Sequence, residues 1–187
     1  MKVIIIEGPD NTGKNTLIQH ILDSNLIVSL IHGDKPKSNE PFLEQQKLFL
    51  SHAEKTIKES IEQKTDIVIF NRYYQGEYVY GQMYRNGDPI KIKKMVSILE
   101  DYLLNNIGYD NIYYVQLNSQ SPYLLKKNDD GKSLSKADLE KIQKEIDLFN
   151  DIYKFSKLKK MKLCISDGDN FRKRENILKQ FIKFIEK

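Results

Sequence analysis

A glycine-rich loop near the amino end constrains this chain more than any other feature of its sequence. Residues 8–16 read GPDNTGKNT, directly after the apolar run 3–6 and directly before a segment in which apolar residues have helical spacing. This is a G-x4-G-K frame, in which successive backbone N–H groups converge on phosphate oxygens and the lysine adds a full positive charge. The amino end of the following helix contributes a partial positive charge. The order strand, loop, helix therefore predicts a loop that binds nucleotide phosphates.

Short apolar runs alternate with longer, helically spaced segments along the rest of the chain. Continuous apolar runs are typical of strands that are buried on both faces of a parallel sheet. Strands alternating with helices predict an α/β fold. We therefore expect one domain over residues 1–187, with a parallel five-stranded sheet flanked by helices. The expected strands are residues 3–6, 26–31, 67–70, 112–117 and 161–165.

The clearest amphipathic helix is expected over residues 139–153, where apolar side chains step by three and four. Ser135 and, three residues later, Asp138 predict a capping box at its start. Residues 33–41 and 128–132 fit neither the strand nor the helix pattern. The second of these segments is expected to be a loop between helices.

Composition narrows the class of protein. Hydrophobic residues make up 40% of the 187 residues, and the net charge of +4 comes from lysines scattered along the whole chain. No motif that reads nucleic acid accompanies this charge, so no nucleic-acid partner is expected. The single Cys164 excludes an internal disulfide framework. No apolar run has the length of a membrane span or the pattern of a signal peptide, which predicts a cytoplasmic chain without a membrane partner.

A second polar site is expected where the third strand ends. Residues 67–82 read IVIFNRYYQGEYVYGQ, so Arg72 closely follows an apolar run. Ligands of open α/β sheets bind beyond the carboxyl ends of the strands. A guanidinium group at that edge is suited to fork onto a second phosphate group. The alternative is an arginine that forms only a surface salt bridge.

Taken together, these residues resemble the thymidylate kinase family of P-loop nucleoside monophosphate kinases. The family's E-G-x-D-x-x-G-K-x-T motif is matched by residues 7–16, and its D-R-Y motif is matched in part by residues 71–73, NRY. The combination of Asp10 with Arg72 and Tyr73 is what points to this family. Over the rest of the chain the resemblance is thin.

The resemblance implies a P-loop NMP-kinase-like fold and transfer of a phosphoryl group from ATP, with Mg²⁺ as cofactor. Lys14, Arg72 and Asp10 are implied as catalytic residues: Lys14 at the β- and γ-phosphates, Arg72 at the acceptor phosphate and Asp10 at the 3′-hydroxyl of the acceptor sugar. Tyr80 is implied to disfavour ribose, and a short lid over about 126–136 is implied to close over the donor phosphates. The implied ATP-binding residues are Gly8, Asn11, Thr12, Gly13, Lys14, Asn15, Thr16, Lys126, Lys127 and Lys132. The implied substrate-binding residues are Asp10, Phe49, Arg72, Tyr73, Glu77 and Tyr80.

Two neutral residues depart from the family's pattern. Asn15 stands where the family has Ser or Thr, whose hydroxyl reaches Mg²⁺, and Asn71 replaces the Asp before the arginine. An amide oxygen is also a hard oxygen donor, so Asn15 is expected to bind Mg²⁺ directly or through water, with altered metal handling. The family's base-holding helix is matched only by Phe49 and His52 on residues 45–55. Glu77 has two interpretations, an acceptor for a base N–H or a solvated helix residue.

Three functions remain open from the sequence. The leading one is ATP-dependent phosphorylation of a pyrimidine deoxynucleoside monophosphate, dTMP and/or dUMP, to the diphosphate. A deoxynucleoside kinase would use the same phosphate loop on free nucleosides, with Glu7 or Asp10 as the base. A degenerate NTP-binding module without kinase activity is suggested by Asn15 and Asn71. Because the resembled family commonly forms dimers, a homodimer is expected in each case.

Overall fold

A parallel sheet forms the centre of the computed structural model, which describes residues 1–23, 26–33 and 42–186. Its strand order is β2-β3-β1-β4-β5, and every neighbouring pair runs parallel. This confirms the predicted five-stranded parallel sheet. The strands are β1 (Lys2–Glu7), β2 (Val28–His32), β3 (Ile67–Asn71), β4 (Ile112–Asn118) and β5 (Lys159–Cys164).

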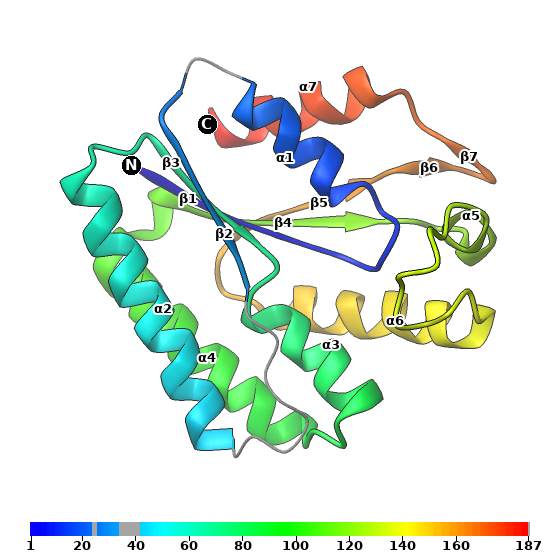
Figure 1. The fold of residues 1–187 in the computed structure, drawn as a ribbon, viewed down its shortest axis with the longest axis horizontal. Coiled ribbons are helices and arrows are strands. Elements are labelled where there is room, and N and C mark those ends of the chain that lie inside the picture. The colour runs from blue at the N-terminus through cyan, green and yellow to red at the C-terminus, as the bar shows by residue number, and fades with distance from the viewer. Residues whose placement is uncertain (24–25, 34–41, 187) are drawn as a thin grey trace.

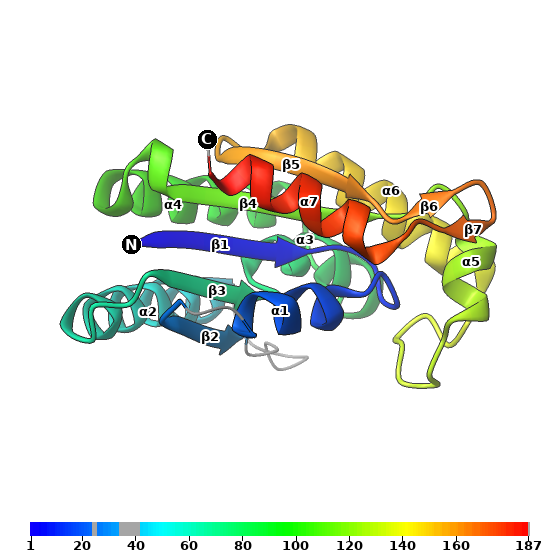
Figure 2. The same cartoon turned by 90° about the horizontal axis from the view of Figure 1, so that it is seen from above.

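Helices cover both faces of this sheet (Figure 1). On one face lie α1 (Lys14–Leu22) and α7 (Arg174–Ile185). The other face carries α2 (Phe42–Glu62), α3 (Tyr74–Tyr84), α4 (Pro89–Ile107) and α6 (Leu139–Phe155). Figure 2 shows the short helix α5 (Pro122–Lys127) and the hairpin of β6 (Ser166–Asp167) and β7 (Asn170–Phe171) beyond the carboxyl end of the sheet. A single 3₁₀ turn, η1 (Tyr109–Asn111), precedes β4.

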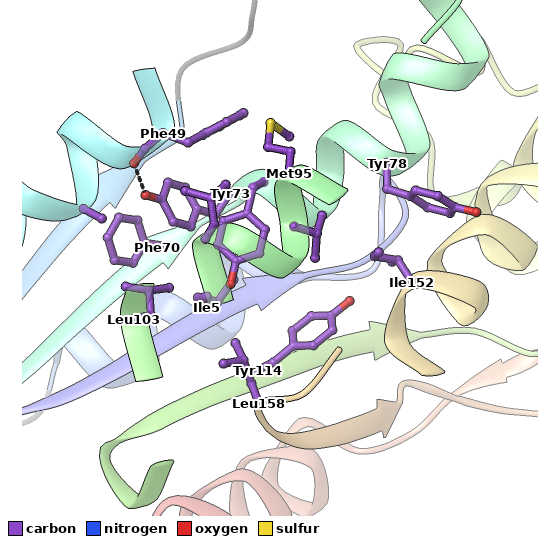
Figure 3. Close-up of a cluster of buried hydrophobic side chains, with 14 of the residues drawn as sticks. Ile5, Phe49, Phe70, Tyr73, Tyr78, Met95, Leu103, Tyr114, Ile152 and Leu158 are labelled. Atoms are coloured by element: carbon purple, nitrogen blue, oxygen red, sulfur yellow. Dashed lines mark hydrogen bonds between the residues drawn. The ribbon is translucent and has the colours of Figure 1, made fainter. Parts of the chain in front are cut away.

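Strand β1 shows why a continuous apolar run is needed at the centre of the sheet. Successive side chains of a strand point to opposite faces. Val3 and Ile5 enter the core under α2, α3, α4 and α6, whereas Ile4 and Ile6 enter the core under α1 and α7. All four side chains are fully buried. Figure 3 shows the first of these cores, in which aromatic rings are prominent.

The observed strands differ from the predicted ones by one or two residues at their ends, and two of them start two residues away from the predicted position. β5 begins at Lys159, two residues before the predicted start, where it pairs with Tyr113 of β4. The ammonium groups of Lys159 and Lys160 lie over the rings of Tyr113 and Tyr153. Lysines that pack on aromatic rings are invisible to a search for apolar residues. β2 begins at Val28, which pairs with Ile67 at the start of the ladder with β3, and the preceding Leu26 and Ile27 are exposed.

The predicted capping box at Ser135 is wrong. The helix begins at Leu139, and Asp138 itself is the N-cap, accepting hydrogen bonds from the backbone N–H groups of Glu140 and Lys141 at 3.0 and 3.2 Å. Ser135 is buried and hydrogen-bonded to Ser133. An aspartate N-cap therefore replaces the expected pair.

Two segments, residues 33–41 and 128–132, fitted neither the strand nor the helix pattern in the sequence. Residues 128–132 form part of the connection between α5 and α6, as expected. Of the polar stretch 33–41, residues 34–41 lie outside the described residues. Among the helices that are described, none combines the length and the apolar character that crossing a membrane requires.

Candidate active site

The phosphate loop, residues 8–13, joins the end of β1 to the start of α1. Gly8 has φ 140°, and a Cβ atom at this position would lie 2.2 Å from the carbonyl oxygen of Leu117 on β4. Gly13 has φ 78° and is the N-cap residue of α1. Both positions need glycine, one for close approach of two backbones and one for a left-handed turn. The backbone itself therefore requires the two glycines of the predicted loop.

Lys14 folds back over this loop. Its Nζ donates hydrogen bonds to the carbonyl oxygens of Gly8 and Pro9 at 2.8 and 2.6 Å. Burial, together with the nearby cation of Arg72, lowers the pKa of Lys14 to about 7. An anion beside Nζ favours the charged ammonium form. Lys14 is thus placed to exchange backbone carbonyls for phosphate oxygens.

Arg72 stands between the phosphate loop and α3. Its backbone is left-handed, with φ 66°, and its N–H donates to the carbonyl oxygen of Ile6 at 3.1 Å. The guanidinium forms an ion pair with the carboxylate of Asp10, donates to Tyr80 Oη at 2.7 Å and lies 5.0 Å from the centroid of that ring. The structure therefore brings Asp10, Arg72 and Tyr80 into direct contact. Left-handed backbone at a residue other than glycine is strained and is frequent at functional sites.

Glu7 fixes the turn on which Arg72 lies. Its carboxylate Oε1 accepts the backbone N–H groups of Tyr73 at 2.6 Å and Gly76 at 3.0 Å. The side chain is fully buried at the end of β1, and this burial raises its pKa. A Cβ atom at position 76 would lie 3.2 Å from the same oxygen, so Gly76 leaves room for the carboxylate. Glu7 is therefore an anchor for the start of α3.

A pocket opens beside the Asp10–Arg72 ion pair, and we call it the acceptor pocket. Its lining includes all six residues that the sequence predicted to bind the acceptor: Asp10, Phe49, Arg72, Tyr73, Glu77 and Tyr80. The rest of the lining is Gly33, Gly76, Arg85, Lys132 and Leu134.

Two aromatic rings define part of the wall of the acceptor pocket. Phe49 and Tyr73 pack edge to face, with ring centroids 5.4 Å apart and an interplanar angle of 89°. Tyr73 Oη also donates to the backbone carbonyl oxygen of Phe49 (Figure 3), which ties the start of α3 to α2. His52, the second predicted candidate for the base-holding helix, is not among the residues that line this pocket.

The surroundings of Glu77 exclude one of its two interpretations. Its side chain is only 3% exposed and forms an ion pair with Arg85, whose side chain is 14% exposed. A solvated helix residue is therefore the wrong description. Arg85 was missed by the sequence analysis, because nothing in the sequence marks it as a partner of a residue eight positions earlier.

Two further hollows flank the phosphate loop. One lies over the loop and shares Asp10, Gly33, Arg72 and Lys132 with the acceptor pocket, so the two spaces adjoin. The other shares Asn11, Thr12, Gly13 and Asn128 with the first but none of the residues of the acceptor pocket. Its lining includes Thr16 and His20 of α1, Asn128, and Phe171 and Arg172 of the β6–β7 hairpin region. Residues of the phosphate loop therefore line both hollows.

The predicted lysines of the lid have different positions. Lys132 lines the acceptor pocket and the hollow over the phosphate loop, whereas Lys126 and Lys127 are exposed on the last turn of α5 and line none of these three spaces. The loop that carries Lys132 contacts the phosphate loop at two points. Asn11 Nδ2 donates to Asp129 Oδ1 at 3.3 Å, and the N–H of Leu134 donates to Asp10 Oδ2 at 3.2 Å.

Comparison with known proteins finds similar solved structures. No protein-family model matches the chain, and no curated protein matches it significantly. Among solved structures, the YorR protein from Bacillus subtilis, in complex with phosphorylated GDP, is similar over 99% of this chain and 96% of its own, with a TM-score of 0.72 and 19% identity. Thymidylate kinase from Ehrlichia chaffeensis is similar over 97% of both chains, with a TM-score of 0.56 and 20% identity. Deoxyadenosine kinase from M. mycoides with bound dATP is similar over 100% of both chains, with a TM-score of 0.57 and 15% identity.

The fold is that of the P-loop nucleoside monophosphate kinases. The sequence analysis expected Asn15 to bind Mg²⁺. Asn15 Oδ1 accepts a hydrogen bond from Asn71 Nδ2 at 3.0 Å, and Asn71 Nδ2 lies 3.3 Å from His32 Nδ1. Among the described residues there is no group of three or more His, Cys, Asp or Glu side chains suited to a metal. The donor set fits a metal that is held mainly by nucleotide phosphates, with the neutral oxygen of Asn15, which lines the hollow over the phosphate loop, as an additional donor.

Glu145 on α6 is a buried acid that the sequence analysis missed. Its Oε2 accepts the backbone N–H of Asp10 at 3.5 Å, and its Oε1 accepts the hydroxyl of Tyr84 at 3.4 Å. Burial, and next the carboxylate of Asp10, raise the pKa of Glu145 to about 7, against the opposing effect of Arg72 and Lys14. The amphipathic pattern of α6 gave no sign that Glu145 contacts Asp10, because the two residues are 135 positions apart in the sequence.

The raised pKa of Glu145 predicts a pH-dependent stability. A carboxyl group that binds its proton more tightly in the folded chain than in the unfolded chain destabilises the fold as pH rises from about 4.5 to about 7. Glu145→Gln removes this effect, so its free energy of unfolding relative to wild type should increase between pH 5 and pH 8, by about 3 kcal/mol at most. Urea unfolding at several pH values measures the difference. Asp147→Asn, an exposed acid on the same helix, is the control, and a difference for Glu145→Gln that stays constant with pH would contradict the assignment.

Proposed function

We propose that this chain transfers the γ-phosphoryl group of ATP to a pyrimidine deoxynucleoside monophosphate, dTMP and/or dUMP. The observation that carries the proposal is the position of Arg72. It lines both the hollow over the phosphate loop and the acceptor pocket. A guanidinium at the junction of a phosphate-donor site and a second pocket is suited to hold an acceptor phosphate in line with the γ-phosphate.

The reaction follows from this placement. An oxygen of the acceptor phosphate forms a bond to the γ-phosphorus while the bond from that phosphorus to the β–γ bridging oxygen breaks, and ADP leaves with the bonding electrons. The N–H groups of the phosphate loop and Lys14 hold the β- and γ-phosphates, and Arg72 holds the acceptor. When bound, Mg²⁺ neutralises charge on the β- and γ-phosphates. Lys132, on the proposed lid over residues 126–136, adds positive charge and helps exclude water from the closed site.

A phosphorylated acceptor is favoured over a free nucleoside. A nucleoside kinase needs a carboxylate base beside the sugar hydroxyl. Glu7 is engaged by two backbone N–H groups, and Asp10 is engaged by Arg72 and by the N–H of Leu134. The printed names of the similar structures include both a thymidylate kinase and a deoxyadenosine kinase, so they support kinase chemistry without selecting the acceptor.

The walls of the acceptor pocket support a deoxypyrimidine. Phe49 and Tyr73 supply aromatic surface for one base ring. Tyr80 is fixed by its hydrogen bond with Arg72, in a position that we propose crowds a 2′-hydroxyl. We further propose that residues 1–187 act as a single kinase domain in the cytoplasm, which functions as a homodimer.

Lys14→Ala should abolish turnover while leaving the fold intact. Loss of one preorganised charge at the transferring phosphate commonly costs about 3 kcal/mol or more, which is roughly a hundredfold in kcat. ADP release is measured with a coupled assay, and folding is checked by thermal unfolding. Lys14→Met keeps the aliphatic volume and should behave alike, whereas Lys58→Ala on the exposed surface of α2 should have no effect. Near wild-type turnover by a folded Lys14 variant would remove the basis for a phosphate loop.

Arg72→Ala should weaken the acceptor far more than ATP. Removal of a charge-assisted fork costs about 2–3 kcal/mol, so KM for the acceptor should rise roughly 30- to 150-fold. Arg174, which lines a hollow that shares no residue with the acceptor pocket, provides a matched control. Arg174→Ala should leave the acceptor KM unchanged. If Arg72→Ala instead loses ATP and keeps its acceptor affinity, the two sites are assigned the wrong way round.

The acceptor itself is tested with a panel of dTMP, dUMP, dCMP, dGMP, dAMP, UMP and the free nucleosides. We expect pyrimidines to exceed purines and deoxynucleotides to exceed UMP in kcat/KM. Because a hydrophobic pocket resolves one methyl group by only about 1–3 kcal/mol, dUMP should be used at a rate comparable with dTMP. A purine as best substrate, or a nucleoside preferred over every monophosphate, would overturn the proposed acceptor. Absence of ADP release with every compound would instead favour an NTP-binding module without kinase activity.

A further inference from the structure

The ion pair between Glu77 and Arg85 lies in the wall of the acceptor pocket. Glu77 is in the first turn of α3, and Arg85 is the C-cap residue of the same helix, with its backbone N–H donating to the carbonyl oxygen of Gly81 at 3.0 Å. Both side chains line the acceptor pocket. Arg72 immediately precedes the N-cap of α3 and Arg85 follows its last residue, so the two guanidinium groups come from opposite ends of this helix.

The structure makes room for this pair. A Cβ atom at position 81 would lie 2.5 Å from Glu77 Oε1 and 3.2 Å from a side-chain carbon of Ile92. Glycine at this position therefore leaves space for the carboxylate beside the helix. Gly81 occupies the middle of α3, where glycine lowers helix stability by roughly 0.5–1 kcal/mol relative to alanine. Gly81 therefore lowers the stability of α3 but leaves room for the carboxylate of Glu77 at the pocket.

Stability alone does not account for such a pair. Removing two charges from water costs several kcal/mol per ion, and a buried ion pair is weak evidence for a stabilising role. The pair is also incompletely matched within the described residues, because Arg85 Nε is buried and has no hydrogen-bond partner there. A pocket wall that combines a carboxylate acceptor with a spare guanidinium donor is suited to a ligand edge that carries a donor next to an acceptor.

Nucleobase edges differ in how they place these groups. In uracil and thymine, one N–H donor at N3 is flanked by carbonyl oxygens on both sides, O2 and O4. An acid and a guanidinium side by side match this edge whichever side the guanidinium occupies. Cytosine has an acceptor at N3 and a donor at N4, so the pair is complementary only when the acid faces N4–H and the guanidinium faces N3. In the opposite orientation the acid faces an acceptor and the guanidinium faces a donor. Adenine and guanine likewise match the pair in only one sense.

We propose that Glu77 and Arg85 read the edge of a 4-oxopyrimidine, with the Glu77 carboxylate accepting the N3–H and the Arg85 guanidinium donating to a neighbouring carbonyl oxygen. This rests on the proposed function and names the base class that its acceptor pocket selects. Arg72 then holds the phosphate and the Glu77–Arg85 pair holds the base of the same nucleotide. The 5-methyl group of thymine takes no part in this contact, which agrees with the expected use of both dTMP and dUMP.

The test uses binding, measured by calorimetry on the full chain, so that it does not depend on turnover. N3-methyl-dTMP lacks the N3–H and should bind wild type at least about tenfold more weakly than dTMP, as expected for loss of a charge-assisted hydrogen bond. Glu77→Gln should weaken dTMP and dUMP by a similar factor and should reduce the preference for dUMP over dCMP, because an amide offers both a donor and an acceptor. The same variant should bind dTMP and N3-methyl-dTMP within about threefold of each other, since the contact is already lost.

Asp151→Asn is the matched control. Asp151 on α6 forms an ion pair with Lys93, accepts the hydroxyl of Tyr78, and is not among the residues that line the acceptor pocket. This variant should leave the ratio of dTMP to N3-methyl-dTMP affinity unchanged. Arg85→Gln should reduce affinity for dTMP and dUMP as Glu77→Gln does, while thermal unfolding reports any change in fold.

Three outcomes overturn the inference: equal affinity of wild type for dTMP and N3-methyl-dTMP, uniform weakening of every nucleotide by Glu77→Gln, or no binding of any deoxynucleotide to the folded chain. Failure of this base contact and failure of the proposed kinase activity can be told apart by two further outcomes. If dTMP binds with the expected dependence on N3–H but releases no ADP from ATP, the base contact stands and the kinase proposal falls. If dTMP is phosphorylated with no sensitivity to N3 methylation, the kinase proposal stands and this contact falls.

Discussion

The buried carboxylate of Glu7 is the interaction on which the arrangement of this site depends. It ends the central strand β1 and binds the N–H groups of Tyr73 and Gly76, where the chain leaves β3 and enters α3. This contact fixes the direction of the turn that carries Arg72 in its left-handed conformation. Because β1 also leads into the phosphate loop, one acid joins the two parts of the site. Its location in the core protects these hydrogen bonds from competition by water.

The local parts of this fold were readable from the sequence because they depend on backbone conformation. Gly8 and Gly13 occupy positions that other residues fit poorly, and the apolar runs match strands buried on both faces. The family resemblance assigned Asp10 and Arg72 to one site, and the carboxyl ends of the neighbouring parallel strands β1 and β3 bring them together. The predictions of the loop and the strands needed only the order of elements and the chemistry of a few residues.

Other parts of the site depend on contacts that no local pattern encodes. Glu145 reaches Asp10 from a helix whose periodicity reports only which face is buried. The Glu77–Arg85 pair is set by where α3 ends, and helix ends are hard to place from sequence. Lys126 and Lys127 were grouped with Lys132 by charge alone, but α5 directs them to solvent. Charge identifies candidates, whereas the path of the backbone decides which of them reach the site.

The lysines of β5 have a consequence for how this protein meets other molecules. β5 is an edge of the five-stranded sheet, and its sequence KKMKLC places three lysines in six residues. An open sheet edge is a template for a strand from another chain, and lysines along it oppose such pairing because their charges would have to leave water. Addition of a further strand at β5 is therefore disfavoured. Self-association of this protein should therefore leave the β5 edge of the sheet unpaired.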